Sequence, residues 1–265
     1  MSHRQIIVTL FCSLGLFSAS RIWSDDLTAS QLLPETTVGY LEVTDTAAIL
    51  SNIYDHPLSH HIQGLDVFKK ATETEGYRGF LTGRKFVEIQ IGADWRPALE
   101  ALTAGGVYVA FDAKTQGAVA LVRARDEETA ENFRAKLLEL TRLNEAKNGK
   151  ADAYRDVTVY KLDKKSAAAV VHDWIVVTNN GELGKSVLDR LLDDQPAERQ
   201  AEVAGTLSAN PQFKLSHARR KKDSQAWAYG NIQAIRDAGA AKKLFEGKAE
   251  NPAAELLIGG IQSVL

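Results

Sequence analysis

Short turns join five of the seven strand candidates in this chain, and they limit its fold more than any other feature. The five candidates are rich in valine and alanine and span 107–111, 118–124, 157–162, 167–172 and 174–178. Connections this short are typical of β-hairpins, in which neighbouring strands run antiparallel. The sequence therefore predicts an antiparallel sheet.

Helical patterns separate these strands. Residues 58–104 are mainly helical in pattern, and amphipathic helices are expected over 127–143 and 182–192, where apolar residues recur at helical spacing. Asp45 and Asp126 are the expected N-caps, because a carboxylate can accept a hydrogen bond from the free amides of a first turn. We expect an α+β fold in which the helices pack on one face of the antiparallel sheet.

The two remaining strand candidates, 37–43 and 226–232, resemble each other. Each carries a central tyrosine, Tyr40 or Tyr229, and leads directly into a helical segment. A Gly-Gly pair follows both helical regions, at 105–106 and at 259–260, although its distance from the tyrosine differs. These parallels predict a weak internal duplication.

On this interpretation residues 25–224 form an α+β domain, and 225–265 begin a second copy that is apparently truncated. A truncated copy would leave an unpaired sheet edge. The alternative is that the chain ends in a helix that simply docks on the rest of the protein. The sequence leaves both interpretations open.

The first residues have the order of a cleavable secretory signal. Arg4 precedes an unbroken apolar and small run from Ile6 to Phe17, and three small residues follow at 18–20. A dozen helical residues cover about 18 Å, which is short of the roughly 30 Å hydrocarbon core of a bilayer. We expect residues 1–24 to be removed, leaving an exported protein, periplasmic or extracellular, without a membrane span.

Removal of this signal would also remove Cys12, the single cysteine. A cysteine-free mature chain has no disulfide, thiolate metal site or cysteine nucleophile, so an ordinary apolar core must stabilise it. The 32 basic residues nearly balance the 34 acidic ones. This balance argues against nucleic acid as a partner, since proteins that bind it carry a basic excess.

One histidine cluster has the chemistry of a metal site. Histidines four residues apart on a helix can share a zinc ion, and the cluster contains His56, His60 and His61 with Asp55 as a possible fourth ligand. However, Pro57 separates the first two histidines, and no glutamate lies where a zinc protease places its base. The other interpretation is a corner between two helices with solvated or capping histidines.

Two further motifs imitate binding sites. Residues 174–186 lead from a strand to Gly184-Lys185-Ser186, as a phosphate-binding loop does, but position 179 holds asparagine where that loop needs glycine. Asn179 and Glu182 predict a capping box there instead. The basic run 219–222 has the charge to contact an acidic polymer, a polysaccharide or nucleic acid, or it lies in solvent.

Several motifs together resemble a family of uncharacterised exported proteins of planctomycete-like bacteria with duplicated α+β segments. They are residues 33–43, Asp55-His56-Pro57-Leu58, Gly105-Gly106 before paired strands, and Asp173-Trp174 before Asn179-Asn180. Members of that family are longer than this chain, so the resemblance implies truncation. It implies no catalytic residue.

The sequence thus predicts a non-catalytic binding or structural module of the cell envelope, with no cofactor and with an envelope protein or polysaccharide as the partner. No Gly-x-Ser-x-Gly motif of a serine hydrolase is present. The alternative function is a metal-dependent hydrolase that uses zinc on His56, His60 and His61.

Overall fold

The computed structural model describes residues 27–66, 94–148, 152–193 and 204–237, together with isolated positions between 70 and 88. The expected signal peptide, residues 1–24, lies outside this part of the chain, and so does Cys12. No helix among the described residues is both long and apolar enough to cross a membrane.

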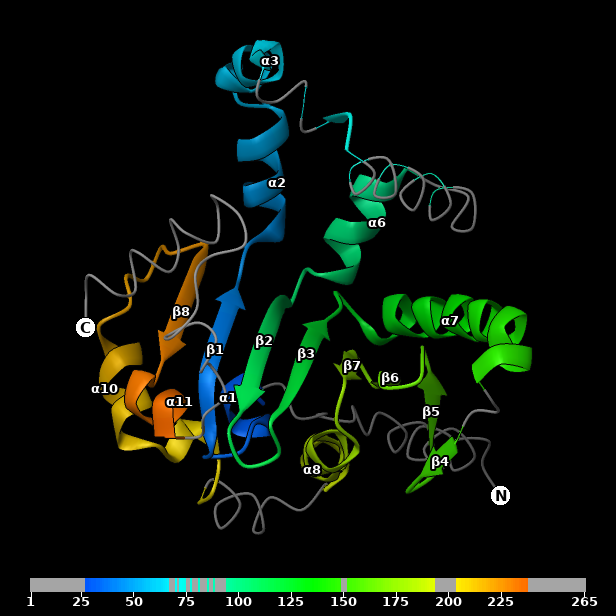
Figure 1. Ribbon diagram of the computed structural model, residues 1–265, viewed down its shortest axis with the longest axis vertical. Helices are drawn as coiled ribbons and strands as arrows, with labels where there is room; N and C mark the ends of the chain where they lie inside the picture. The colour runs from blue at the N-terminus through cyan, green and yellow to red at the C-terminus, as the bar shows by residue number, and fades with distance from the viewer. Residues whose placement is uncertain are drawn as a thin grey trace, which may run out of the picture.

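One antiparallel sheet of eight strands organises the described residues, which confirms the predicted α+β class (Figure 1). The strands lie side by side in the order β4-β5-β6-β7-β3-β2-β1-β8. In chain order they are β1 (Thr37–Val43), β2 (Gly106–Asp112), β3 (Gly117–Arg123), β4 (Asp152–Tyr154), β5 (Val157–Lys161), β6 (Ala167–Val171), β7 (Trp174–Thr178) and β8 (Ala226–Gly230). The sequence predicted each of them except β4, which has only three residues.

Strand β8, which was expected to begin a second copy, is the edge strand of this same sheet. It pairs with β1, and the two central tyrosines, Tyr40 and Tyr229, lie opposite each other. The described residues therefore form one continuous sheet up to residue 230. The internal duplication is not confirmed by this arrangement and stays a prediction.

Helices cover the sheet unevenly. They are α1 (Ala29–Leu32), α2 (Thr46–Tyr54), α3 (Pro57–Gly64), α6 (Trp95–Leu102), α7 (Glu127–Asn148), α8 (Gly181–Leu192), α10 (Pro211–Ala218), α11 (Ile232–Asp237) and the 3-10 helix η1 (Leu207–Ala209). The helices α1, α8 and α10 place their apolar residues in one core with the sheet. Helix α7 packs on the opposite face, against β5, β6 and β7, so the expectation that all helices lie on one face was wrong.

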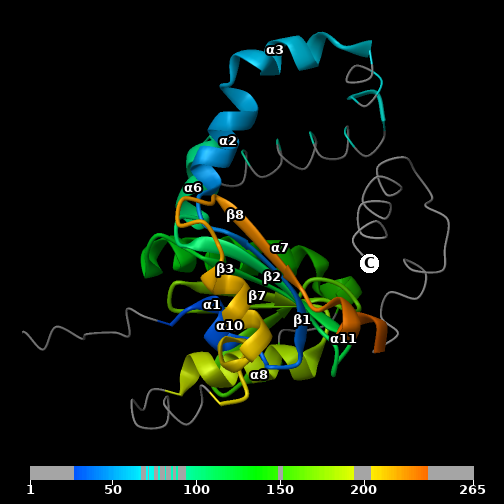
Figure 2. The same cartoon turned by 90° about the vertical axis from the view of Figure 1, so that its left-hand side faces the viewer.

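The strand order explains which helices lie on which face of the sheet. β3 and β4 lie far apart in the sheet, so the chain must cross β7, β6 and β5 between them, and α7 does so on one face. The connection from β7 to β8 contains α8 and α10 and follows the other face. β1 and β2 are neighbours, so their connection need not cross the sheet. Its helices α2 and α3 instead rise from the end of the sheet and bend away from the side of α1 and α10 (Figure 2).

The sheet therefore has two halves that differ in cover. In the two-sided half, β5 to β7, the side chains facing α7 are buried: Tyr160, Ala168 and Ile175 are each 2% exposed. In the one-sided half, β8, β1, β2 and β3, the described helices that share the apolar core, α1 and α10, pack on one face. On its other face, Leu41 is 40% exposed and Val109 is 41% exposed. We call this second surface the open face.

Candidate functional site

The histidines of the predicted metal site lie at the corner between α2 and α3. His56 and His61 are exposed, and the Nδ1 atom of His56 accepts a hydrogen bond from the backbone N–H of Leu58 at 3.2 Å. His60 belongs to α3, but its side chain is outside the described residues. Among the side chains that are described, no group of three has a metal-binding arrangement. The zinc site on His56, His60 and His61 stays a prediction.

The carboxylate that was expected to complete this site is held elsewhere. Both oxygens of Asp55 accept hydrogen bonds from the guanidinium of Arg96, at 2.9 and 2.7 Å. These hydrogen bonds lower the pKa of Asp55 to about 2. Asp55 therefore links the end of α2 to α6.

Residues 174–186, which resemble a phosphate-binding loop in sequence, lead into the capped start of helix α8. The side-chain oxygen of Asn180 accepts hydrogen bonds from the backbone N–H groups of Glu182 and Leu183, at 3.0 and 3.1 Å. These amides are the ones that a phosphate would need, so the cap occupies its place. The predicted cap, Asn179, was wrong by one residue, because its side chain instead accepts a hydrogen bond from the N–H of Ala118.

Packing explains why this segment has a glycine at position 184. A Cβ atom at Gly184 would lie 2.8 Å from Cγ2 of Thr178, so a larger residue would push α8 away from β7. The glycine thus allows close approach of the helix to the strand.

The basic run 219–222 divides between two environments. Arg219, Lys221 and Lys222 are exposed. Arg220 instead turns inward, and its guanidinium donates a hydrogen bond to the carboxylate of Glu42 on β1. The inward arginine reduces the free basic surface to three side chains.

Glu42 is the centre of a buried polar network on the helix-covered face of the one-sided half. It is 7% exposed, accepts a hydrogen bond from the Tyr40 hydroxyl at 3.1 Å, and lies 3.9 Å from Nε2 of His217. Burial, together with the neighbouring Glu42 carboxylate, raises the pKa of the Tyr40 hydroxyl. The members of the network satisfy one another, so we interpret it as the attachment of α10 to β1.

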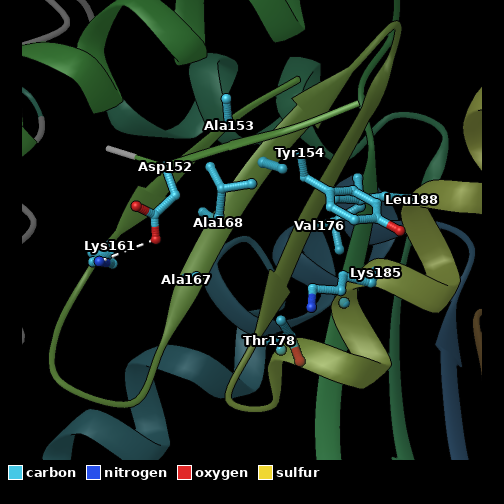
Figure 3. Close-up of a pocket in the computed structure, with 14 residues that line it drawn as sticks. Asp152, Ala153, Tyr154, Lys161, Ala167, Ala168, Val176, Thr178, Lys185 and Leu188 are labelled. Atoms are coloured by element: carbon cyan, nitrogen blue, oxygen red, sulfur yellow. Dashed lines mark ion pairs between the residues drawn. The ribbon is translucent and has the colours of Figure 1, made fainter. Parts of the chain in front are cut away.

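A cavity of about 430 Å³ lies between α8 and the strands β4 to β7, in the two-sided half (Figure 3). Its wall is mainly apolar. The aliphatic residues that line it are Ala153, Val159, Ala167, Ala168, Ala169, Val176 and Leu188. Pockets for small ligands have this size and this mainly apolar lining.

Small residues create this cavity. Strand register places Ala169 between Val159 of β5 and Val176 of β7, so the middle position of the row is a methyl group only. From the helix side, Gly181 and Gly184 contribute no side chain. The space between sheet and helix therefore stays unfilled at this end of the core.

Polar groups stand at the edge of the cavity. Lys161 pairs with Asp152 at 3.1 Å on one side, and Lys185 lies near Thr178 on the other (Figure 3). Lys185 also pairs with Glu182 at 3.1 Å, and its hydrogen bond to that carboxylate raises the pKa of the Lys185 ammonium. The cavity thus combines an apolar wall with two ammonium groups at its edge.

This site was not predicted from the sequence. Its signal is the run Ala167-Ala168-Ala169 within a strand candidate, since strands favour β-branched and aromatic residues. Three alanines in succession predict a place where the sheet is not filled by its own side chains.

Comparison with known proteins adds little to this geometry. No protein-family model matches the chain, and no curated protein matches it. A solved structure titled "Structure of crystal form I of TP0453" is similar, with a TM-score of 0.37 and 11% sequence identity, over 87% of this chain and 71% of that chain. Similarity at this level supports neither a function nor a partner. The resemblance to exported planctomycete-like proteins stays a prediction.

Proposed function

We propose that the chain is an exported, non-catalytic binding module for a small amphipathic molecule with an apolar body and an anionic end. The observation that carries this proposal is the cavity between α8 and β4 to β7. A ligand that replaces water along an apolar wall gains the hydrophobic free energy of that contact. The alanine methyl groups of β6 favour an unbranched or flat apolar body, because they leave a smooth wall.

The two lysines support the anionic end. The carboxylates that pair with Lys161 and Lys185 are those of Asp152 and Glu182, whose side chains are 65% and 78% exposed. Exposed pairs of this kind contribute only about 0 to 1 kcal/mol. An anionic ligand can therefore replace either carboxylate as the partner of its lysine with little loss of free energy.

The polar groups of the wall support binding rather than catalysis. The hydroxyl of Thr178 donates a hydrogen bond to the carbonyl oxygen of Ala118 at 2.9 Å. The hydroxyl of Tyr154 donates to the carboxylate of Asp189 at 3.0 Å. Both hydroxyls already have acceptors within the protein, so they contribute shape more than reactivity.

Calorimetric titration with sodium laurate, an apolar chain with a carboxylate, tests this function. We expect saturable binding that Ala167→Leu weakens by about tenfold, because the larger side chain enters the cavity. The matched control is Ala98→Leu, which enlarges a half-buried alanine of α6 far from the cavity. Lys185→Gln should weaken laurate binding but not binding of the neutral 1-dodecanol. Absence of saturable binding, or equal affinity in Ala167→Leu and Ala98→Leu, would contradict the proposal.

A further inference from the structure

The open face is apolar across four strands. Three cross-strand rows form it: Ala226, Val43, Val107 and Val122; Ala228, Leu41, Val109 and Ala120; Gly230, Gly39, Phe111 and Ala118. None of these residues is charged. Strands that are apolar on both faces belong to sheets that are covered on both faces. The composition of β2 and β3 thus indicates that something covers the open face.

Further apolar side chains are exposed on the connection that rises from this sheet. Ile53, Tyr54, Leu58 and Leu65 are all exposed, and they belong to α2, to α3 or to the residue that follows α3. These helices bend away from the side of α1 and α10, which is the helix-covered side (Figure 2). An occupant of the open face would therefore meet apolar groups on the sheet and beside it.

The chain itself carries a segment of matching chemistry. Residues 252–265 contain a single charged residue, Glu255. The large apolar residues of this segment are Leu256, Leu257, Ile258, Ile261, Val264 and Leu265. An uncharged surface and a nearly uncharged segment of one chain can each remove the other from water.

The path of the chain brings this segment within reach. Helix α11 packs against β1 and ends at Asp237, so residues 238–251 connect the edge of the sheet to the apolar segment. Fourteen residues reach up to about 46 Å when extended. Three strand spacings of about 4.8 Å make the open face only about 14 Å wide. Every part of the face is therefore accessible to residues 252–265.

We propose that residues 252–265 dock on the open face of β8, β1, β2 and β3 and form its cover. A segment tethered to the sheet has a high effective concentration at this surface, so it binds there before a separate molecule does. The docked segment would give the one-sided half the second apolar layer that α7 gives to the other half.

Crosslinking in the full chain tests this docking. In a Cys12→Ala background, the pair Val109→Cys and Leu257→Cys is treated with bismaleimidoethane at low protein concentration. We expect a crosslink within one chain, with a yield about tenfold above that of the control pair Leu215→Cys and Leu257→Cys. Leu215 is a suitable control because it is an exposed leucine, 59% against 41% for Val109, and lies on α10 at the helix-covered face. Equal yields for the two pairs would overturn the proposal.

A labelling rate gives a second measurement. In the Val109→Cys protein, adding Leu256→Asp and Leu257→Asp should accelerate maleimide labelling by about tenfold, because charged residues would leave the apolar face. Adding Leu256→Met and Leu257→Met should leave the rate unchanged. Crosslinks between two chains would show that a second copy covers the face. Protection of Val109→Cys only after addition of phosphatidylcholine vesicles would show that lipid does. Each of these results would overturn the docking.

Discussion

The two halves of the sheet have similar strands but different cover. In the two-sided half, Ile175 of β7 is 2% exposed because α7 lies over it. In the one-sided half, Val109 of β2 points to the open face and is 41% exposed. Both residues lie in strands that are apolar on both faces. The composition of a strand therefore indicates that both faces of the sheet must be shielded from water. The connectivity of the chain decides which helix packs on each face.

The connections differ for a topological reason. α7 joins strands that are four places apart, and it can do so only by crossing the sheet. The longer connection from β1 to β2 joins neighbours, so it is free to leave the sheet as α2 and α3. The half that helices cover on both faces can thus enclose a ligand cavity, whereas the open face is left for another segment to cover.

Truncation of one apolar side chain in each half should give the largest contrast. Ile175→Ala removes atoms from a filled core, so we expect it to lower the free energy of unfolding by about 3 kcal/mol. Val109→Ala should cost about 1 kcal/mol, because much of this side chain is exposed among the described residues. Urea unfolding measures both. A larger loss for Val109→Ala than for Ile175→Ala would break the comparison.

The next effect concerns the attachment of α10 to the one-sided half. Arg220→Met leaves the buried Glu42 carboxylate without its cationic partner, and we expect a loss of about 2 kcal/mol in unfolding free energy. The control is Arg155→Met, because Arg155 makes ion pairs with Asp189 and Asp193 near the surface of the two-sided half. That change should cost less than about 1 kcal/mol. Similar losses would contradict the assignment of a structural role to Glu42.

A smaller effect should appear at alkaline pH. The pKa of Tyr40 is raised in the folded protein by burial and by Glu42. Above the ordinary tyrosine pKa of about 10, the unfolded chain releases this proton while the folded chain keeps it, so stability falls as pH rises. Tyr40→Phe should make the unfolding free energy less dependent on pH between about 9 and 11. The exposed Tyr54 supplies the control, Tyr54→Phe, and an equal change in both variants would contradict this origin.

The smallest effect is expected at the corner between α2 and α3. His56 and His61 are exposed there, and Arg96 holds Asp55. We expect the purified mature protein to contain no stoichiometric zinc and to unfold at the same temperature with and without EDTA. Metal analysis and thermal unfolding test this expectation. One equivalent of zinc that His56→Ala removes would instead support the hydrolase alternative.

Local chemistry made much of the fold predictable. The side chains of Asp45 and Asp126 accept hydrogen bonds from Ala48 and Thr129 at the starts of α2 and α7, as their positions in the sequence predicted. Valine-rich strands joined by a short turn were also enough to predict the hairpin of β2 and β3. Each of these features depends on residues close together in the chain.

The remaining features depend on distant residues. The sequence does not show that Ala169 lies between Val159 and Val176, because the register of three strands decides this. Nor does it pair Glu42 with Arg220, which follows it by 178 positions. The cavity and the buried network therefore became apparent only from the folded chain. The shift of the cap from Asn179 to Asn180 is a local error of one residue.

A titration followed by methyl NMR tests the central claim most directly, because it observes both halves at once. With sodium laurate, we expect saturating shifts for the methyl groups of Ala167, Ala169 and Val176, which line the cavity. The methyl groups of Leu41 and Val109 on the open face should not shift. Saturating shifts at Leu41 and Val109, with none at the three cavity residues, would contradict the account.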